Sequence, residues 1–127
     1  MPGLDAAGNF LDVLNVLHPS VHFTMERSNN DSIPFIETLI TKKGNKLETQ
    51  AYRKPTNTSL LLHFQSHTEL RYKKCLIKIM DNRAKALSST HQEFVNECRH
   101  LKSMFHHLGY HSSLVKCIIN KCPCNRW

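Results

Sequence analysis

Basic side chains are the residues of this sequence best suited to chemistry with a partner molecule. Ten candidate contacts lie around one predicted turn, in the connector after it and on one predicted helix; they are Lys42, Lys43, Lys46, Tyr52, Arg53, Lys54, Arg71, Lys73, Lys74 and Lys78. Cationic groups spaced in this way can contact phosphates along a nucleic-acid backbone without reading its sequence. Tyr52 could stack on a base or a sugar, and ordinary packing is the alternative role for it. These residues predict a nucleic-acid partner, which could be RNA, DNA or a hybrid duplex.

The distribution of charge along the chain points to the same kind of partner. The 127 residues carry 17 Lys and Arg against 10 Asp and Glu, a net charge of +7 with His neutral. Residues 1–40 hold five acidic and one basic side chain, a net of −4, and residues 41–127 hold the other sixteen basic and five acidic ones, a net of +11. A strongly basic segment favours an anionic partner. The alternative is that these charges only solvate the surface.

The acidic residues do not support metal-dependent catalysis. Phosphoryl transfer with metal ions needs carboxylates that lie close together in the fold. The sequence has no Asp-Asp or Asp-x-Asp pair, and its four aspartates are scattered, at Asp5, Asp12, Asp31 and Asp81. We therefore expect no catalytic residues and no enzyme activity.

Cysteine and histidine residues near the C-terminus raise the question of a structural zinc site. Such sites usually show Cys-x₂₋₄-Cys and His-x₃₋₅-His pairs. The run Cys117-x₄-Cys122-x-Cys124 departs from this pairing, and Cys98 falls on a predicted apolar helix stripe, where a thiol packs as a small core residue. We expect no metal ion, no other cofactor and no small-molecule substrate.

Cysteine usage and hydropathy also bear on the compartment. Five cysteines is an odd number, which argues against a secreted disulfide framework and for a reducing compartment, nuclear or cytoplasmic. No apolar run approaches the ~18–20 residues that a membrane helix needs, so we expect no membrane association. The N-terminus has no basic region of the kind that begins a secretory signal.

The elements that must position the basic residues indicate an α+β fold, with a short strand and a β-hairpin followed by a three-helix, helix-turn-helix-like bundle. Residues 1–20 are predicted to be an N-terminal helix that ends before Pro19. Residues 21–58 form the β segment, in which 21–26 alternates as a strand and 33–41 pairs with 46–52 around Gly44.

Residues 59–122 are predicted to form a helical, helix-turn-helix-like domain in which the state of the apolar run at 60–64 stays open, and 123–127 a tail. Two capping boxes, Ser66-x-x-Glu69 and Thr90-x-x-Glu93, would begin the first two helices. Gly109 would end the second helix, and Ser112 or Ser113 would cap the third. The short turn before the third helix is compatible with a helix-turn-helix.

A set of motifs, in this order along the chain, resembles the reverse transcriptases of Penelope-like retroelements. The matching segments are Leu14-Asn15 with His18, residues 21–26, residues 33–40, the run Tyr52-Arg-Lys-Pro-Thr-Asn-Thr58, the pair Ser66-His67 and the tripeptide Leu108-Gly109-Tyr110. The resemblance implies the C-terminal part of such an enzyme: the end of the palm, a primer-grip hairpin and the thumb. The helical part is similar to the helix-turn-helix domain of animal retroelement-derived proteins.

The chain departs from that family in ways that bear on activity. Glu37 stands where the family usually has Asp, and Leu108 and His111 replace its Asn and Pro. The catalytic Tyr-x-Asp-Asp motif and the GIY and YIG tripeptides of the endonuclease are absent, and Met1–Asn9 has no counterpart. The resemblance therefore implies a non-catalytic fragment of an RNA-directed DNA polymerase that grips nucleic-acid backbone.

Two alternatives remain open at this point. The first is a stand-alone helix-turn-helix DNA-binding protein that reads bases with the helix at 113–120, whose polar readers would be only Lys116, Asn120 and Lys121. The second is a retroelement remnant with no selected function.

Overall fold

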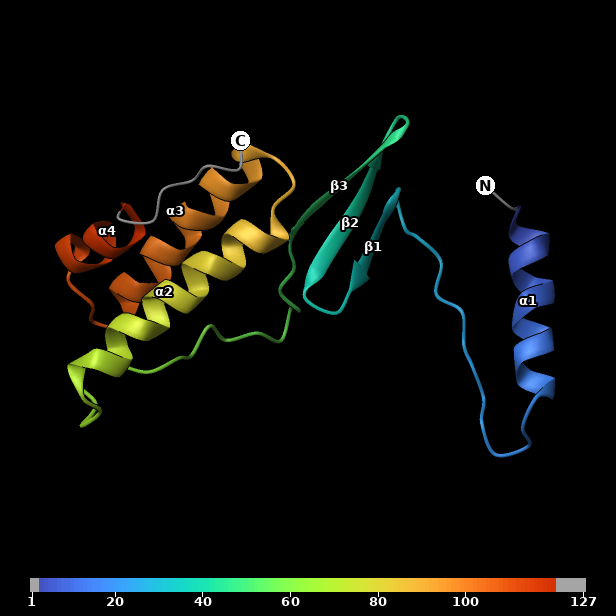
Figure 1. Cartoon of the computed structure of the whole chain (residues 1–127), viewed down its shortest axis with the longest axis horizontal. Helices are drawn as coiled ribbons and strands as arrows, with labels where there is room; N and C mark the ends of the chain where they lie inside the picture. Colours follow the sequence, from blue (N-terminus) through green and yellow to red (C-terminus); the bar gives the residue numbers. More distant parts are fainter. Residues whose placement is uncertain (1–2, 121–127) are drawn as a thin grey trace.

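Three parts follow one another along the molecule (Figure 1). The computed structural model describes residues 3–120. In chain order its elements are α1 (Leu4–Val16), β1 (Ser32–Phe35), β2 (Thr38–Lys43), β3 (Lys46–Ala51), α2 (Leu70–Leu87), α3 (His91–His107) and α4 (Ser112–Asn120). Helix α1 stands at one end, the sheet lies in the middle, and α2, α3 and α4 form a helical unit at the other end. The α+β class with three C-terminal helices is confirmed.

The sheet is antiparallel, with the strand order β1-β2-β3. Strands β2 and β3 form the hairpin predicted around Gly44, and Lys43 is the Cα partner of Lys46 across the turn. Gly44 has φ +59, a conformation that glycine adopts without steric cost. The turn chemistry thus fixes where Lys42, Lys43 and Lys46 stand.

The predicted strand at 21–26 is wrong, because this segment has no regular structure and is exposed throughout. The side-chain amide of Asn15 takes the place of a sheet partner. The backbone N–H of Phe23 donates to Asn15 Oδ1 at 2.7 Å, and Asn15 Nδ2 donates to the Phe23 carbonyl at 3.2 Å. An alternating pattern forms a strand only when a neighbouring strand can share its hydrogen bonds. Here no strand of the described chain lies beside the segment, and Phe23 pairs with the side chain of Asn15 in α1 instead.

The predicted single strand at 33–41 is in fact two strands. A tight turn at Ile36 and Glu37 separates β1 from β2, so that Phe35 pairs with Thr38. Ile36 adopts φ +56, which is rare for a β-branched residue. Positions 36 and 37 hold Ile and Glu, which are not turn-favouring residues, so the residue types predict one continuous strand over 33–41.

Polar contacts join the sheet to the helical unit. The N–H of Thr49 in β3 donates to Ser89 Oγ at 2.9 Å, and the N–H of Ser89 donates to the Thr49 carbonyl at 3.0 Å. Arg83 of α2 forms an ion pair with Glu37 at 2.8 Å. The turn between α2 and α3 thereby covers part of the β3 edge, which would otherwise present unpaired backbone groups.

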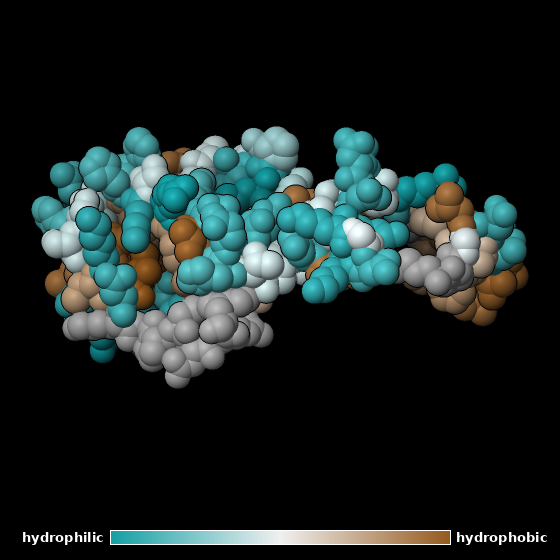
Figure 2. Space-filling view, turned by 90° about the horizontal axis from the view of Figure 1, so that it is seen from above, coloured by the Kyte–Doolittle hydropathy of each residue, from teal (hydrophilic) through white to brown (hydrophobic). Residues whose placement is uncertain are grey.

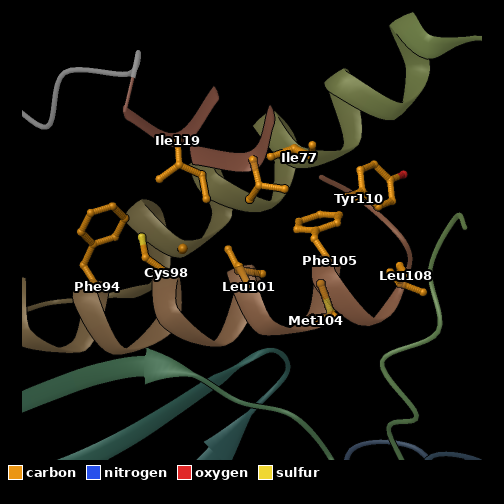
Figure 3. Close-up of a cluster of buried hydrophobic side chains, with 11 residues drawn as sticks. Ile77, Phe94, Cys98, Leu101, Met104, Phe105, Leu108, Tyr110 and Ile119 are labelled. Carbon is orange, nitrogen blue, oxygen red and sulfur yellow. The ribbon is translucent and has the colours of Figure 1, made fainter. Parts of the chain in front are cut away.

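The hydrophobic core lies inside the helical unit (Figure 3). Ile77 from α2, Leu101 and Phe105 from α3 and Val115 from α4 are at most 2% exposed. Tyr110 closes one end, with its ring 5.0 Å from that of Phe105 and its hydroxyl donating to the Leu62 carbonyl at 3.0 Å. Within residues 3–120, every buried hydrophobic side chain belongs to this one cluster.

The helix ends follow two of the four sequence signals. Thr90 accepts a hydrogen bond from the Glu93 N–H at 3.3 Å, as its capping box predicts, and Gly109 ends α3 with φ +85. The box at Ser66 is wrong, because α2 begins at Leu70 and has no side-chain cap. The Ser66 carbonyl instead accepts from Lys73 Nζ, which holds this segment outside the helix. The predicted cap at Ser112 or Ser113 is wrong as well, because α4 begins at Ser112 and both serines lie inside the helix.

Cys98 is buried in the core, as its place on the apolar stripe predicts. Burial, with a smaller contribution from the charge of Asp81, raises the pKa of this thiol to about 11. Because only the thiolate is alkylated, we expect iodoacetamide at pH 8 to modify the exposed Cys75 and Cys117 long before Cys98. Peptide mass spectrometry against time measures this directly. Equal rates at Cys98 and Cys75 in folded protein would contradict the burial.

Two features of the described residues bear on the membrane and metal questions. None of the helices between residues 3 and 120 has the length and apolar character to cross a membrane. Over the same residues, no three His, Cys, Asp or Glu side chains come together as a possible metal site. Cys122 and Cys124, together with the predicted tail at 123–127, lie outside the described residues.

Candidate nucleic-acid interface

The predicted contacts at the β2–β3 turn are only partly available to a ligand. Lys43 forms an ion pair with Glu48 at 2.5 Å, and the hydrogen bond and charge of Glu48 raise the pKa of Lys43. Lys42 and Lys46 are exposed and have no acidic partner among residues 3–120. The turn therefore presents two free amines on a rigid hairpin.

The contact predicted at Arg53 is occupied inside the molecule. Its guanidinium binds both carboxylate oxygens of Glu97 in α3, with Nη1 2.9 Å from Oε2. The side chains of this pair are only 25% and 11% exposed. Tyr52 and Arg53 also line a hollow of about 240 Å³ between the end of β3 and the helices, whereas Lys54 is exposed. Arg53 fixes the sheet to α3, and its charge is already neutralised.

Of the four contacts predicted on α2, one is buried and bonded inside the molecule and three are exposed. Lys73 is 7% exposed, and its amine donates to the Ser66 carbonyl at 2.8 Å while lying 5.2 Å from the Phe64 ring centre. Arg71, Lys74 and Lys78 are exposed and follow i, i+3, i+7 spacing, which places them on one side of the helix. Arg71 has a distant partner in Glu69, at 3.8 Å.

The predicted residues do not form one surface. The β2–β3 turn and the first turns of α2 lie at well-separated places in the molecule (Figure 1). Lys42 and Lys46 belong to the first place, and Arg71, Lys74 and Lys78 to the second. No phosphate could contact both groups at once.

A second group of basic side chains, around the α3–α4 turn, is not among the ten predicted contacts. Arg99, Lys102 and His106 lie at i, i+3, i+7 on α3, and Lys116 projects from α4. Lys102, His106, Ser112 and Lys116 line a hollow of about 60 Å³ between the two helices. Arg99, Lys102 and Lys116 are exposed, and no carboxylate of the described chain pairs with them. We call Arg99, Lys102, His106 and Lys116 the turn cluster.

Rigid elements hold the turn cluster in place. The Tyr110 N–H donates to the Phe105 carbonyl at 3.0 Å, and the Phe64 N–H donates to the Leu108 carbonyl at 2.9 Å. The helix period could have revealed the cluster, because the apolar stripe through Phe94, Cys98 and Leu101 leaves 99, 102 and 106 together on a polar side. The structure adds that α4 brings Lys116 beside them. Asn120 ends α4, and Lys121 lies outside the described residues.

Comparison with known proteins gives one match, and it covers this part of the chain. None of the curated proteins and none of the solved structures matches the chain. A family model does match, over residues 60–120, which comprise α2, α3, α4 and the segment that leads into them. The region that carries the turn cluster is thus similar to the animal helix-turn-helix domain.

Proposed function

We propose that residues 60–120 are a module that binds nucleic-acid backbone and has no catalytic activity of its own. The observation that carries this proposal is the turn cluster: exposed cations from two helices, held on a packed core and free of acidic partners in the described chain. Cationic side chains on rigid helices suit phosphates, since phosphate contacts fix the register of a nucleic acid without specifying its sequence. The similarity to a helix-turn-helix domain supports the same function.

The origin of the module is a finer proposal. We infer that the chain corresponds to the last palm strands, the primer-grip hairpin and the thumb of a Penelope-like reverse transcriptase, and that it acts inside the cell, in the nucleus or the cytoplasm. The ordered motifs at 21–26, 33–40 and 52–58 support this inference. Lys42 and Lys46 on the β2–β3 turn, and Arg71, Lys74 and Lys78 on α2, would then be further backbone contacts.

The backbone-binding proposal predicts a local loss of affinity. We expect Lys102→Gln/Lys116→Gln to weaken binding to a 20-base-pair duplex at least tenfold, since two phosphate contacts disappear. The slope of log K against log salt should become shallower by roughly 1.8, at ~0.9 per phosphate of B-DNA. Fluorescence anisotropy with labelled DNA, RNA and hybrid duplexes at several salt concentrations measures both quantities.

A matched control separates the turn cluster from net charge. Ser20→Asp/His22→Asp lowers the net charge by the same two units in an exposed segment outside residues 60–120, and we expect it to change the affinity less than twofold. Equal losses in the two variants would overturn the proposal. Primer extension with Mg²⁺ and nucleotides should give no product, and robust extension would overturn the non-catalytic part.

A further inference from the structure

A hollow of about 380 Å³ lies between α3 and the connector that joins β3 to α2. Its volume is within the range of pockets that hold small organic ligands. Leu60 of the connector and Met104 of α3 give it apolar surface, while His100, Ser103 and His107 add imidazole and hydroxyl groups. No carboxylate of the described chain lines it. The hollow therefore suits a partly apolar group that carries polar edges.

The hollow is held open because the connector is bound to the helical unit on both sides of it. Before the hollow, Arg53 binds the carboxylate of Glu97 in α3. After it, the Phe64 N–H donates to the Leu108 carbonyl at the end of α3, at 2.9 Å. Residues 58–60, between these two anchors, form the connector wall of the hollow. A ligand would thus meet a preformed site, which lowers the ordering cost of binding.

The α3 side of the hollow is a row of polar side chains next to the turn cluster. His100, Ser103 and His107 each follow by one residue a member of the turn cluster on α3, so they form a second row about 100° further round the helix. The two rows adjoin where the rings of His106 and His107 lie 6.2 Å apart. All six side chains are exposed and none is acidic. Hydrophilic residues cover most of the helical unit in Figure 2, so a partner meets it mainly through polar groups.

We propose that the hollow takes an unpaired nucleobase from a nucleic acid whose backbone lies on the turn cluster, an inference that rests on the proposed function. The imidazoles of His100 and His107 can stack on the ring, and Leu60 and Met104 offer it apolar contact. The hydroxyl of Ser103 can donate to or accept from the edge of the base. A paired base is stacked inside its duplex and cannot enter. The protein should therefore prefer a duplex that ends in a single strand over a blunt one, with little dependence on which base is present.

Fluorescence anisotropy with three labelled substrates tests this preference. The first is a blunt 20-base-pair duplex, and the second is the same duplex with a four-nucleotide overhang, at the 5′ or the 3′ end. The third carries an overhang of abasic units, which keeps the phosphates and lacks the bases. We expect the overhang with bases to bind at least fivefold more tightly than the abasic one, in at least one polarity, because one stacked base contributes at least this factor.

The double variant His100→Ala/His107→Ala places the preference in the hollow. It should lower the ratio between the two overhang affinities to less than twofold. Its circular dichroism spectrum should stay unchanged, because both side chains are exposed and alanine favours helices. The matched control His18→Ala/His22→Ala removes two exposed imidazoles outside residues 60–120 and should keep the full ratio.

The outcomes separate this inference from the proposed function. Equal affinity for the two overhangs in the unsubstituted protein would overturn the inference alone, provided that Lys102→Gln/Lys116→Gln still weakens binding to the blunt duplex. A ratio that His100→Ala/His107→Ala leaves intact, or that the control variant also abolishes, would overturn it as well. A protein that binds none of the three substrates would overturn both proposals.

Discussion

Phe105→Ala is expected to lower the free energy of unfolding by about 3–5 kcal/mol, the range for truncating a large buried aromatic side chain. Phe105 is fully buried between α2, α3 and α4, and its ring meets Tyr110 edge-on at 66°. The variant loses the free energy gained by removing the ring from water. It also leaves a cavity, because the surrounding side chains lose their contacts with the ring. Because Tyr110 also anchors the α3–α4 turn, the turn cluster should lose its fixed geometry.

Urea denaturation followed by circular dichroism measures this change. Phe35→Ala is the matched control, since Phe35 is 61% exposed in β1 and should change the stability by less than about 0.5 kcal/mol. If Phe105→Ala unfolds at the same urea concentration as the unsubstituted protein, the core assigned to the helical unit is incorrect.

The second large effect concerns a charge buried in the same unit. The Asp81 side chain is 0% exposed, and Lys85 donates to its Oδ2 at 2.6 Å one helical turn away. The other oxygen, Oδ1, is buried without a hydrogen-bond partner in the described chain. Lys85→Met would leave a buried carboxylate without its ion pair, and we expect a loss of about 3–5 kcal/mol in the free energy of unfolding.

The double variant Asp81→Leu/Lys85→Met tests the cause of that loss. Replacing both partners of a buried ion pair by apolar residues of similar size is often neutral or stabilising. We therefore expect the double variant to unfold at a temperature close to, or above, that of the unsubstituted protein in a thermal melt. A double variant as unstable as Lys85→Met alone would show that packing, and not the unpaired charge, explains the loss.

The helical unit could be predicted from sequence because its signals are local. The apolar residues of α3 recur at 3.6-residue spacing, Thr90 and Glu93 mark its start, and Gly109 marks its end. Each signal involves residues within one or two turns of the same helix. The prediction from the Ser66 box was wrong because a different contact holds this segment. The amine of Lys73, in α2, reaches the Ser66 carbonyl, and residue types near Ser66 do not indicate that bond.

The candidate site was less predictable, because partners distant in the sequence decide which cations are free. Glu97 binds Arg53 across 44 residues, and no pattern around either residue indicates this pairing. Lys73 and Lys74 are neighbours in sequence, yet the helix period buries one and exposes the other. Lys116 joins Arg99 and Lys102 only through the packing of α4 on α3. A count of basic residues therefore predicts a nucleic-acid partner but does not tell which of these cations remain exposed.

The polar junction between β3 and the α2–α3 turn has a consequence for how the molecule opens. No residue of strands β1, β2 and β3 is buried in the described chain. The contacts that join the sheet to the helices include the two hydrogen bonds between Thr49 and Ser89. Local opening costs least where few apolar groups are buried. The sheet and the helices should therefore behave as separate foldons, with amide protons of β2 and β3 exchanging with solvent faster than those around Leu101. The helical unit can then stay folded while the hairpin detaches.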